Sequence, residues 1–343
     1  MSEKIKIWFV ETESAGRVLL GREVREYAPR SLAAFDCERV ERAEQCAFVK
    51  GRFDVVIPLD MPLVTGEDVE RAVETLRRKH LSVLGLGDEG SGAFVTSGEG
   101  GEPHCRLVLP HFVKTEGAKN FRIVYNLMKE RILSRLCAEG VFIEDFDNTV
   151  VDDTVEAERG AVVLPFCTLR GRTSLGAGSK VAGAYIEDSA IGEGAEIVMS
   201  HVVSSEVGER TTVGPFARLR GAVIDAGCRI GDFVEVKGSR LHEGVKSAHL
   251  TYIGDAEVGA RTNVGCGTVF CNYDGKNKHR TTVGTDCFIG ANSNLVAPLN
   301  IGDGTFVAAG TTVTRDTESG SFVIGRVRQE GREGGNPLRK SSR

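Results

Sequence analysis

One feature constrains the fold of this chain more than any other: in its second half, aliphatic residues recur at every sixth position. The longest unbroken run is Val283, Ile289, Leu295, Ile301, Val307 and Val313. The same spacing joins four shorter runs, which are Ile191, Ile197 and Val203; Val207, Val213 and Leu219; Ile230 and Val236; and Val258, Val264 and Phe270. Strands repeat every two residues and helices every 3.6, so neither element explains this period.

A six-residue period is typical of a hexapeptide β-helix, in which each hexad forms one short strand and a turn. One aliphatic side chain per hexad points inward, and small residues permit the tight corners. Three hexads form one triangular coil, so residues 150–318 predict about nine coils. The 42 glycines and the low aromatic content of 6% suit such a narrow core. A β-sandwich would not keep a six-residue frame over half a chain.

The frame is interrupted once, between Phe270 and Val283, by the polar segment "CNYDGKNKHRTT". An insertion of this kind leaves the stack as a loop, which is where binding groups often lie. The faces of a solenoid are flat, so a small-molecule site needs a loop or a neighbouring subunit as a wall. The sequence therefore predicts a symmetric oligomer with sites between subunits, most simply a three-fold one.

The first 118 residues follow a different pattern, which is typical of an α/β domain. Strand-like "KIKIWFV" and "FDVVIPL" precede a helical "GEDVERAVETLRRKH" and another apolar run, "LSVLGLG". Residues 119–140 predict one amphipathic helix, because Val124, Met128, Ile132 and Leu136 recur every four residues while Arg131 faces elsewhere. The predicted organisation is a domain over 1–118, a linker helix over 119–140, a solenoid over 141–325 and a tail over 326–343.

Composition excludes several functional classes. The formal net charge of -5 gives no electrostatic footprint for nucleic acid. No apolar run approaches the roughly 18 residues of a membrane helix, and the N-terminus does not read as a signal peptide. We expect a soluble cytoplasmic protein without membrane insertion. The nine cysteines are scattered and form no Cys-x-x-Cys, so we expect reduced, buried thiols.

Five segments carry a specific resemblance: "GPFARLRGA", "DFVEVKGSRL", "KSAHLTYIGDAEVGARTNVGCGT", "CNYDGKNKHRT" and "VAAGTTVTRD" with the later "VIGRVRQ". They resemble the C-terminal half of the bacterial bifunctional GlmU proteins. Those proteins couple a glucosamine-1-phosphate N-acetyltransferase to an N-acetylglucosamine-1-phosphate uridyltransferase, in the pathway to UDP-N-acetylglucosamine and cell-wall precursors. The resemblance is close over residues 205–329 and looser over 119–204.

The resemblance implies a left-handed parallel β-helix that forms a homotrimer and transfers acetyl from acetyl-CoA to the amine of glucosamine-1-phosphate. The six-residue spacing gives the coil, whereas its left hand comes from the family. His249 matches the catalytic base, a role that suits an imidazole titrating near neutrality. Arg220 and Lys237 match the residues that hold the sugar phosphate, and Tyr252 and Asn263 match the pair that orients the sugar ring.

The resemblance also implies an acetyl-CoA site, whose matching residues are Cys266, Asn272, Tyr273, Ala291, Ala309 and Arg326. Two of these depart from the family pattern. Cys266 stands where the family has Ala with a backbone role, so a backbone N–H could still meet the thioester oxygen. Ala291 stands where a Ser is usual, so a hydroxyl contact to the coenzyme would be lost there.

The first 118 residues resemble the uridyltransferase half of GlmU only in part. In that family the first strand leads into a Gly-rich loop that cradles nucleotide phosphates. Here the strand runs into "VETES", which places Glu11 and Glu13 where the phosphates would lie. Asp60 and Asn120 match metal-binding positions, so Mg²⁺ is expected only if uridyl transfer is retained. We therefore expect a reduced nucleotidyltransferase-like domain that has lost this activity.

Several alternatives remain at this stage. The chain could be a bifunctional enzyme with a diverged pyrophosphorylase activity, an acetyltransferase for another amino sugar, or a non-enzymatic regulatory homologue. Hexapeptide solenoids can also bind metal, as in γ-class carbonic anhydrases. The four solenoid histidines, His201, His242, His249 and His279, do not have the close spacing of such a site. Without the surrounding match, an exposed His249 would read as a solvated side chain.

Overall fold

A computed structural model of the chain describes residues 5–50, 52–88, 90–98, 103 and 105–329. The predicted tail beyond residue 329 lies outside these ranges. The chain divides into two compact units, residues 1–174 and 175–343, which are treated separately below. None of the helices within the described ranges is long and apolar enough to cross a membrane.

The first unit contains a six-stranded mixed sheet in the order β4-β1-β5-β7-β6-β8. Its strands are β1 (Ile5–Val10), β4 (Asp36–Val40), β5 (Phe53–Pro58), β6 (Val83–Leu86), β7 (Ala93–Thr96) and β8 (Arg106–Leu107). β1 pairs in parallel with β4 and β5, and β7 runs antiparallel between β5 and β6. The three apolar runs seen in the sequence are therefore strands, as expected, whereas β4, β7 and β8 carried no clear signal.

Two helices accompany this sheet, α1 (Val24–Ser31) and α2 (Gly66–Arg78), together with the 3-10 turns η1 (Glu13–Gly16) and η2 (Ala43–Gln45). The helix predicted over "GEDVERAVETLRRKH" is α2. It begins with a capping box, in which Thr65 accepts from the Asp68 N–H while the Asp68 carboxylate accepts from the Thr65 N–H. The helix then buries Val69, Val73 and Leu76 in the domain core.

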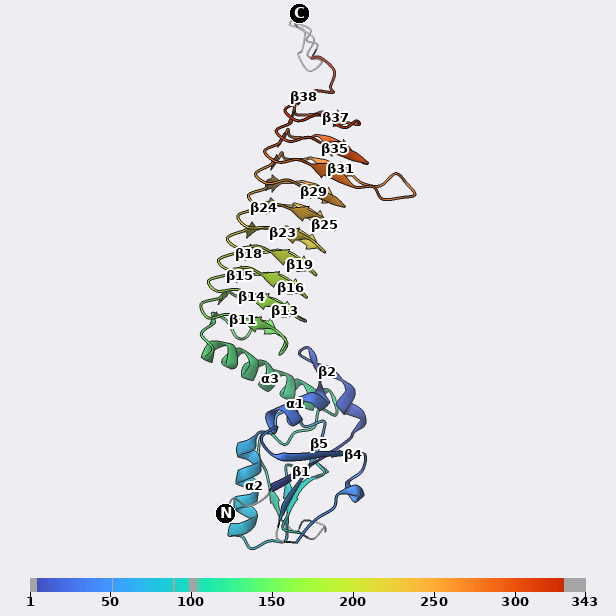
Figure 1. Cartoon of the computed structure of the whole chain (residues 1–343). Helices are drawn as coiled ribbons and strands as arrows, with labels where there is room; N and C mark the ends of the chain where they lie inside the picture. Colours follow the sequence, from blue (N-terminus) through green and yellow to red (C-terminus); the bar gives the residue numbers. More distant parts are fainter. Residues whose placement is uncertain (1–4, 51, 89, 99–102, 104, 330–343) are drawn as a thin grey trace, which may run out of the picture. The chain divides into compact units, whose positions relative to one another are not determined.

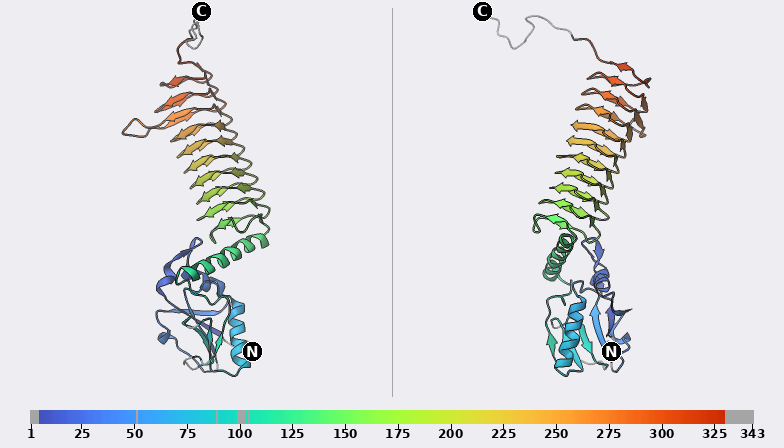
Figure 2. Two further views of the ribbon diagram at one scale, coloured as in Figure 1. Left: turned by 180° about the vertical axis from the view of Figure 1, so that it is seen from behind. Right: turned by 60° about the vertical axis from the view of Figure 1, so that its left-hand side comes forward.

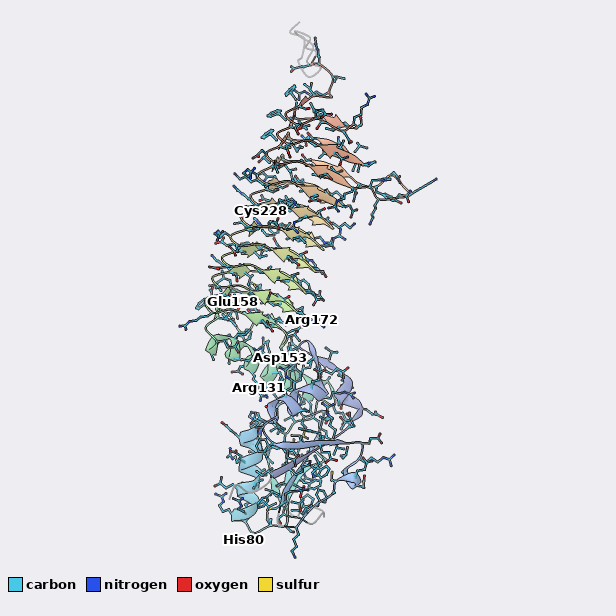
Figure 3. All side chains as sticks on the ribbon, in the orientation of Figure 1. His80, Arg131, Asp153, Glu158, Arg172 and Cys228 are labelled. Atoms are coloured by element: carbon cyan, nitrogen blue, oxygen red, sulfur yellow. The ribbon has the colours of Figure 1, made fainter. Side chains whose placement is uncertain are left out.

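The predicted linker helix is α3 (Ala118–Ala138), and it buries the four residues whose spacing predicted it. Arg131 was expected to face away from the apolar stripe. It instead lies on α3 as a half-buried side chain whose Nη2 donates to the Leu63 carbonyl at 2.8 Å (Figure 3). Burial lowers the pKa of the Arg131 guanidinium. This polar contact is one the helical periodicity does not reveal.

The hairpin of β2 (Val18–Leu19) and β3 (Arg22–Glu23) occupies the sequence where a phosphate-binding loop was missing. Within the same unit, the Leu20 carbonyl accepts from the Asp153 N–H at 2.8 Å. The Asp153 carboxylate pairs with Arg22, with Arg30 at 3.4 Å and with Arg135 at 3.7 Å. This segment therefore holds the start of the solenoid, and Arg30 contributes to that contact.

The rest of the chain forms three parallel sheets, whose strands follow one another in turn around a coil. One sheet, called sheet D below, contains β10 (Val150–Val151), β13 (Thr168–Arg170), β16 (Tyr185–Glu187), β19 (His201–Val203), β22 (Arg218–Arg220), β25 (Glu235–Lys237), β28 (Tyr252–Gly254), β31 (Val269–Cys271), β34 (Asn294–Val296) and β37 (Thr312–Val313).

The other two sheets are called sheet E and sheet C. Sheet E contains β11 (Glu156–Ala157), β14 (Ser174–Leu175), β17 (Ala190–Ile191), β20 (Glu206–Val207), β23 (Val223–Ile224), β26 (Arg240–Leu241), β29 (Ala256–Val258), β32 (Thr281–Val283) and β35 (Leu299–Ile301). Sheet C contains β9 (Phe142–Ile143), β12 (Val162–Val163), β15 (Lys180–Ala182), β18 (Glu196–Val198), β21 (Thr212–Val213), β24 (Arg229–Asp232), β27 (Lys246–His249), β30 (Asn263–Val264), β33 (Phe288–Ile289), β36 (Phe306–Val307) and β38 (Phe322–Val323).

The predicted parallel β-solenoid is thus confirmed, with nine to eleven described strands per sheet against about nine expected coils. All six members of the longest hexad run are buried, as the frame requires. The frame is wrong at one position: Val202 is buried and Val203 is only half-buried, because the coil from Tyr185 to His201 is one residue shorter than the next. The hand of the coil stays a prediction.

The nine cysteines all lie within the described residues, and all are free, as expected. They are not all buried. Cys228 lies in the wall of the solenoid and is buried (Figure 3), where burial raises its pKa to about 11. Cys137 and Cys266 are exposed, which corrects the expectation of uniformly buried thiols.

The interruption of the repeat forms a loop that leaves the stack between β31 and β32, as Figure 1 and Figure 2 show. β31 lies in sheet D and β32 in the next sheet around the coil, sheet E. In the next coil, the chain passes from sheet D to sheet E in six residues, from Leu295 to Ile301. The equivalent passage from Phe270 to Val283 takes thirteen residues, so the loop adds seven residues. The predicted loop is therefore present, and its residues lie outside the wall of the coil.

Candidate active site

Four of the expected site residues follow one another along a single corner of the solenoid, where sheet C turns into sheet D. His249 pairs with Asp232 of the preceding coil. Ser247 pairs with Val264 of the following coil, so two residues further along the chain in each coil His249 lies opposite Cys266. The Cys266 carbonyl accepts from the Asn292 N–H at 2.7 Å, and the Ala291 carbonyl accepts from the Gly310 N–H at 2.8 Å. We call the row Asp232, His249, Cys266, Ala291 and Ala309 the corner column.

His249 ends strand β27 and is open to solvent, with 56% of its side chain exposed. Its Nδ1 lies 3.8 Å from Asp232 Oδ2, which is beyond hydrogen-bond range but close enough for electrostatic attraction. The next residue, Leu250, has φ 48°, so the chain turns sharply directly after the histidine. His249 therefore projects at the corner, where a ligand can reach its ring.

Sheet D brings the two expected phosphate-binding cations into register. Arg220 on β22 pairs with Lys237 on β25, so their side chains are neighbours on one face. Each also has an acidic partner: Arg220 pairs with Glu235, and Lys237 Nζ lies 2.7 Å from Asp255 Oδ1. The hydrogen bond to Asp255 raises the pKa of the Lys237 ammonium, so the lysine is charged at neutral pH.

Asn272 begins the inserted loop, yet only 8% of it is exposed. Its Nδ2 donates to Asp255 Oδ2 at 2.7 Å and to the Tyr252 hydroxyl at 3.4 Å. Both side chains lie over Gly254: a methyl group at that glycine would contact Tyr252 Oη and would lie 2.7 Å from Asn272 Nδ2. The structure thus brings together Lys237, Tyr252 and Asn272, which the sequence assigned to two different substrates.

The loop itself is held by Asp274. Its carboxylate accepts from the Lys276 and Asn277 N–H groups, each at 2.7 Å, and lies 2.7 Å from His279 Nε2. These contacts lower the pKa of Asp274 to about 2, and the backbone hydrogen bond from Asn277 makes the largest contribution. Tyr273 projects from the loop and is 60% exposed, with its hydroxyl donating to the Gly275 carbonyl.

Two expected residues, Asn263 and Arg326, lie apart from Lys237, Tyr252 and Asn272 within one chain. Asn263 lies on β30 of sheet C, so it belongs to a different face from Tyr252 on sheet D. Arg326 follows β38, and its guanidinium donates to the Ala309 carbonyl at the end of the corner column. The expected pairing of Tyr252 with Asn263 around one sugar ring therefore requires more than one face of a single solenoid.

Sequence reasoning missed three carboxylates that lie beside expected site residues: Asp232 beside His249, Glu235 beside Arg220, and Asp255 beside Lys237 and Asn272. None of the three belongs to a hexad position, so the repeat gave no signal for them. Asp255 has φ 50°, and its carbonyl accepts from the N–H of Thr281, which begins β32 after the loop. Other non-glycine residues at solenoid corners, such as Phe233 and Asp286, share this backbone conformation, so it does not distinguish Asp255.

In the first unit, the residues present do not fit a Mg²⁺ site. Asp60 is buried and its Oδ2 accepts from Ser14, while its Oδ1 has no hydrogen-bond partner among the described residues. Asn120 lines a cavity of about 330 Å³ beside Lys114 and Glu116, and Asp60 is not part of its lining. Within the part of the chain that the structure describes, no three acidic, histidine or cysteine side chains form a metal-binding group. One orphaned oxygen is too few for this ion.

The fold and the repeat define the class of protein. Residues 280–315 match the family described as hexapeptide repeat of succinyl-transferase. This match covers the part of the solenoid that carries Ala291 and Ala309. The chain therefore folds as the parallel β-solenoid that its six-residue period predicted, and it matches this repeat family over residues 280–315.

Within that class, the relatives are bifunctional GlmU proteins. The chain is 42% identical over 210 residues to the bifunctional protein GlmU of Clostridium botulinum, covering 61% of this chain and 46% of the relative. It is 45% identical over 213 residues to that of Clostridium acetobutylicum, covering 62% and 47%. The resemblance expected from the sequence is confirmed over this part, and the chain spans about half the length of the curated relatives it matches.

Matches among solved structures are more distant. UDP-N-acetylglucosamine acyltransferase of Francisella novicida is 15% identical with a TM-score of 0.32, covering 51% of this chain and 63% of that one. A mutant of perosamine N-acetyltransferase from Caulobacter crescentus, solved with CoA and GDP-perosamine, is 12% identical with a TM-score of 0.16, covering 83% and 94%.

Proposed function

We propose that this protein is an acetyl-CoA-dependent N-acetyltransferase that converts glucosamine-1-phosphate into N-acetylglucosamine-1-phosphate. The observation that carries the proposal is the juxtaposition of Lys237, Tyr252 and Asn272 around Asp255, because it joins residues expected to bind the sugar phosphate with one expected to bind the coenzyme. The similarity to GlmU relatives supports it.

In this reaction His249 acts as the general base. The sugar amine attacks the thioester carbonyl only after losing a proton, and neutral imidazole accepts a proton near neutral pH. With Nδ1 directed toward Asp232, the other ring nitrogen is the one that faces a ligand.

Arg220 and Lys237 hold the phosphate. Two cations in register on one sheet face match a dianion better than either alone. The Lys237 ammonium has three N–H donors and gives one to Asp255, so the same ammonium can also donate to phosphate oxygens. Tyr252, two strand positions from Gly254 on the same face, then contacts the sugar ring.

The coenzyme lies along the corner column and the loop. The small side chains of Cys266, Ala291 and Ala309 leave room for a thin pantetheine arm beside the backbone. A backbone N–H near Cys266 would donate to the thioester oxygen as charge develops on it. Asn272, Tyr273 and Arg326 complete this side of the site.

The active unit is an oligomer, most simply a homotrimer. Asn263 and Tyr252 lie on different sheets, and a second copy packed beside the first would bring one sheet of each chain to a shared sugar. A row of exposed apolar side chains beside the corner column supports such contact: Met199, Phe216, Phe233 and Leu250, each more than half exposed. The rings of Phe216 and Phe233 stack at 5.4 Å between centroids. Exposed apolar rows of this kind mark association surfaces.

A thiol-release assay with acetyl-CoA tests the proposal against a panel of amino sugars and their 1-phosphates. We expect glucosamine-1-phosphate to give the highest kcat/KM, with glucosamine at least about tenfold lower because it lacks the phosphate. If another amino sugar gives a higher kcat/KM, that sugar is the acceptor instead of glucosamine-1-phosphate. If no acceptor leads to thiol release, the acetyltransferase proposal is wrong. The proposal does not include uridyl transfer. Asp60 and Asn120 do not fit a Mg²⁺ site, and the first 118 residues lack the Gly-rich loop that would bind the nucleotide phosphates.

A further inference from the structure

The carboxylate of Asp255 connects the two halves of the site described above. Its Oδ1 lies 2.7 Å from Lys237 Nζ, on the coil before it, and its Oδ2 accepts from Asn272 Nδ2 at 2.7 Å, on the coil after it. Only 23% of the Asp255 side chain is exposed. Each carboxylate oxygen therefore has its own partner. Lys237 is expected to bind the sugar phosphate, and Asn272 is expected to bind acetyl-CoA.

The backbone repeats the same connection. The Asp255 N–H donates to the Lys237 carbonyl at 2.9 Å, and the Asp255 carbonyl accepts from the N–H of Thr281, where the loop ends. Main chain and side chain together fix Asp255 between the lysine and the loop. A carboxylate held in this way has little freedom to follow one partner and release the other.

The protonation state agrees with these contacts. Burial tends to raise the pKa of Asp255, but the hydrogen bonds from Lys237 and Asn272 outweigh it and lower the pKa. Asp255 is therefore a carboxylate that accepts two hydrogen bonds at neutral pH. The loop residue Lys278 adds to this field and favours the ionised form.

From this geometry we propose that Asp255 is a positioning residue that holds the phosphate-binding Lys237 and the coenzyme loop in their binding conformations at the same time. The inference rests on the proposed function, because it takes Lys237 and Asn272 as ligand-binding residues. Its consequence is specific: loss of one carboxylate weakens the binding of two different substrates, although Asp255 need not touch either.

The experiment measures the Kd of glucosamine-1-phosphate and of acetyl-CoA separately by calorimetry, so that no turnover is needed. We expect Asp255→Ala to raise both Kd values about tenfold, since charge-assisted hydrogen bonds to both partners are lost. Lys237→Ala raises only the Kd of the sugar phosphate. In the Lys237→Ala background, adding Asp255→Ala then leaves that Kd unchanged but still raises the Kd of acetyl-CoA.

Asp286→Ala is the matched control. Asp286 also has a left-handed backbone, with φ 55°, and it pairs with Arg261 on an exposed part of the solenoid. Replacing either aspartate by alanine therefore strains the backbone similarly and breaks one ion pair. We expect the control to leave both Kd values within twofold. Asp255→Asn keeps one acceptor oxygen, so it should raise the two Kd values less than Asp255→Ala does.

The outcomes separate the two proposals. If the wild type binds both ligands but Asp255→Ala raises only one Kd or neither, Asp255 does not connect the two halves, and the proposed function is unaffected. If Asp286→Ala raises both Kd values as much as Asp255→Ala does, the effect is general destabilisation and the inference is wrong. If the wild type binds neither ligand, the proposed function itself fails and this inference fails with it.

Discussion

His249 and Asp232 occupy corresponding positions at successive corners of the solenoid, with Nδ1 of the imidazole 3.8 Å from Oδ2 of the carboxylate. Both side chains are about half exposed, so this pair adds little to stability. In the proposed reaction its role is to orient a base at an accessible corner.

Replacing His249 by alanine should lower kcat for acetyl transfer by about 10²- to 10⁴-fold, because general-base help is lost. Thiol release from acetyl-CoA measures it. His201→Ala is the control, since His201 is an exposed histidine on strand β19 outside the expected site. A His249→Ala variant within tenfold of the wild type would show that the base is another group.

Replacing Lys237 by alanine should raise KM for glucosamine-1-phosphate about tenfold or more, with a smaller effect for unphosphorylated glucosamine. The difference between the two acceptors isolates the phosphate contact, and steady-state kinetics with both sugars measures it. Lys180→Ala, at an exposed position on β15, should change neither KM. Equal loss with the two sugars would place the phosphate elsewhere.

Replacing Ala291 by serine should restore a hydroxyl beside the coenzyme and lower the Kd of acetyl-CoA by about three- to tenfold, the value of one added hydrogen bond. Calorimetry with acetyl-CoA alone measures the change. Ala226→Ser, at the corner between β23 and β24, serves as the control. An unchanged Kd would mean that position 291 does not face the coenzyme.

Replacing Phe233 by glutamate should separate the copies of the chain, because it puts a charge into the exposed apolar row. Sedimentation should then show a mass near the 36.9 kDa of one chain, and acetyl transfer should fall with it. Val327→Glu, at a residue that is 92% exposed, controls for added surface charge. A wild type that already sediments as a monomer would contradict the oligomer.

The inserted loop should keep its conformation between pH 4 and pH 8. The pKa of Asp274 is lowered from 3.8 to about 2 in the folded chain, so the carboxylate is ionised throughout this range. Its stabilising contribution is complete above the unfolded pKa and is lost as the pH falls through the folded pKa. Amide hydrogen exchange at Lys276 and Asn277 measures this. Asp274→Ala should expose both amides at neutral pH, and protection that persists in the variant would show that other contacts hold the loop.

The six-residue period determined most of the second half in advance. A single inward aliphatic residue per hexad is a local requirement, so positions such as Ile289 and Leu295 could be placed in the core from their spacing alone. The exception, Val203, shows the limit of this argument. One residue fewer in a coil shifts which side chain points inward, and only the buried neighbour, Val202, shows where that happened.

The sequence by itself determined the coil, its inward residues and the loop, because these depend on neighbours along the chain. The tertiary structure alone decided which polar residues meet. Asp255 contacts Lys237 and Asn272, about one coil before it and one after it, and this contact depends on the exact length of each coil and of the insertion. The tertiary structure also decided that Arg22 and Arg30, in the segment "GREVREYAPR", pair with Asp153. These residues are more than a hundred positions apart, and contacts at such a separation produce no periodic pattern in the sequence.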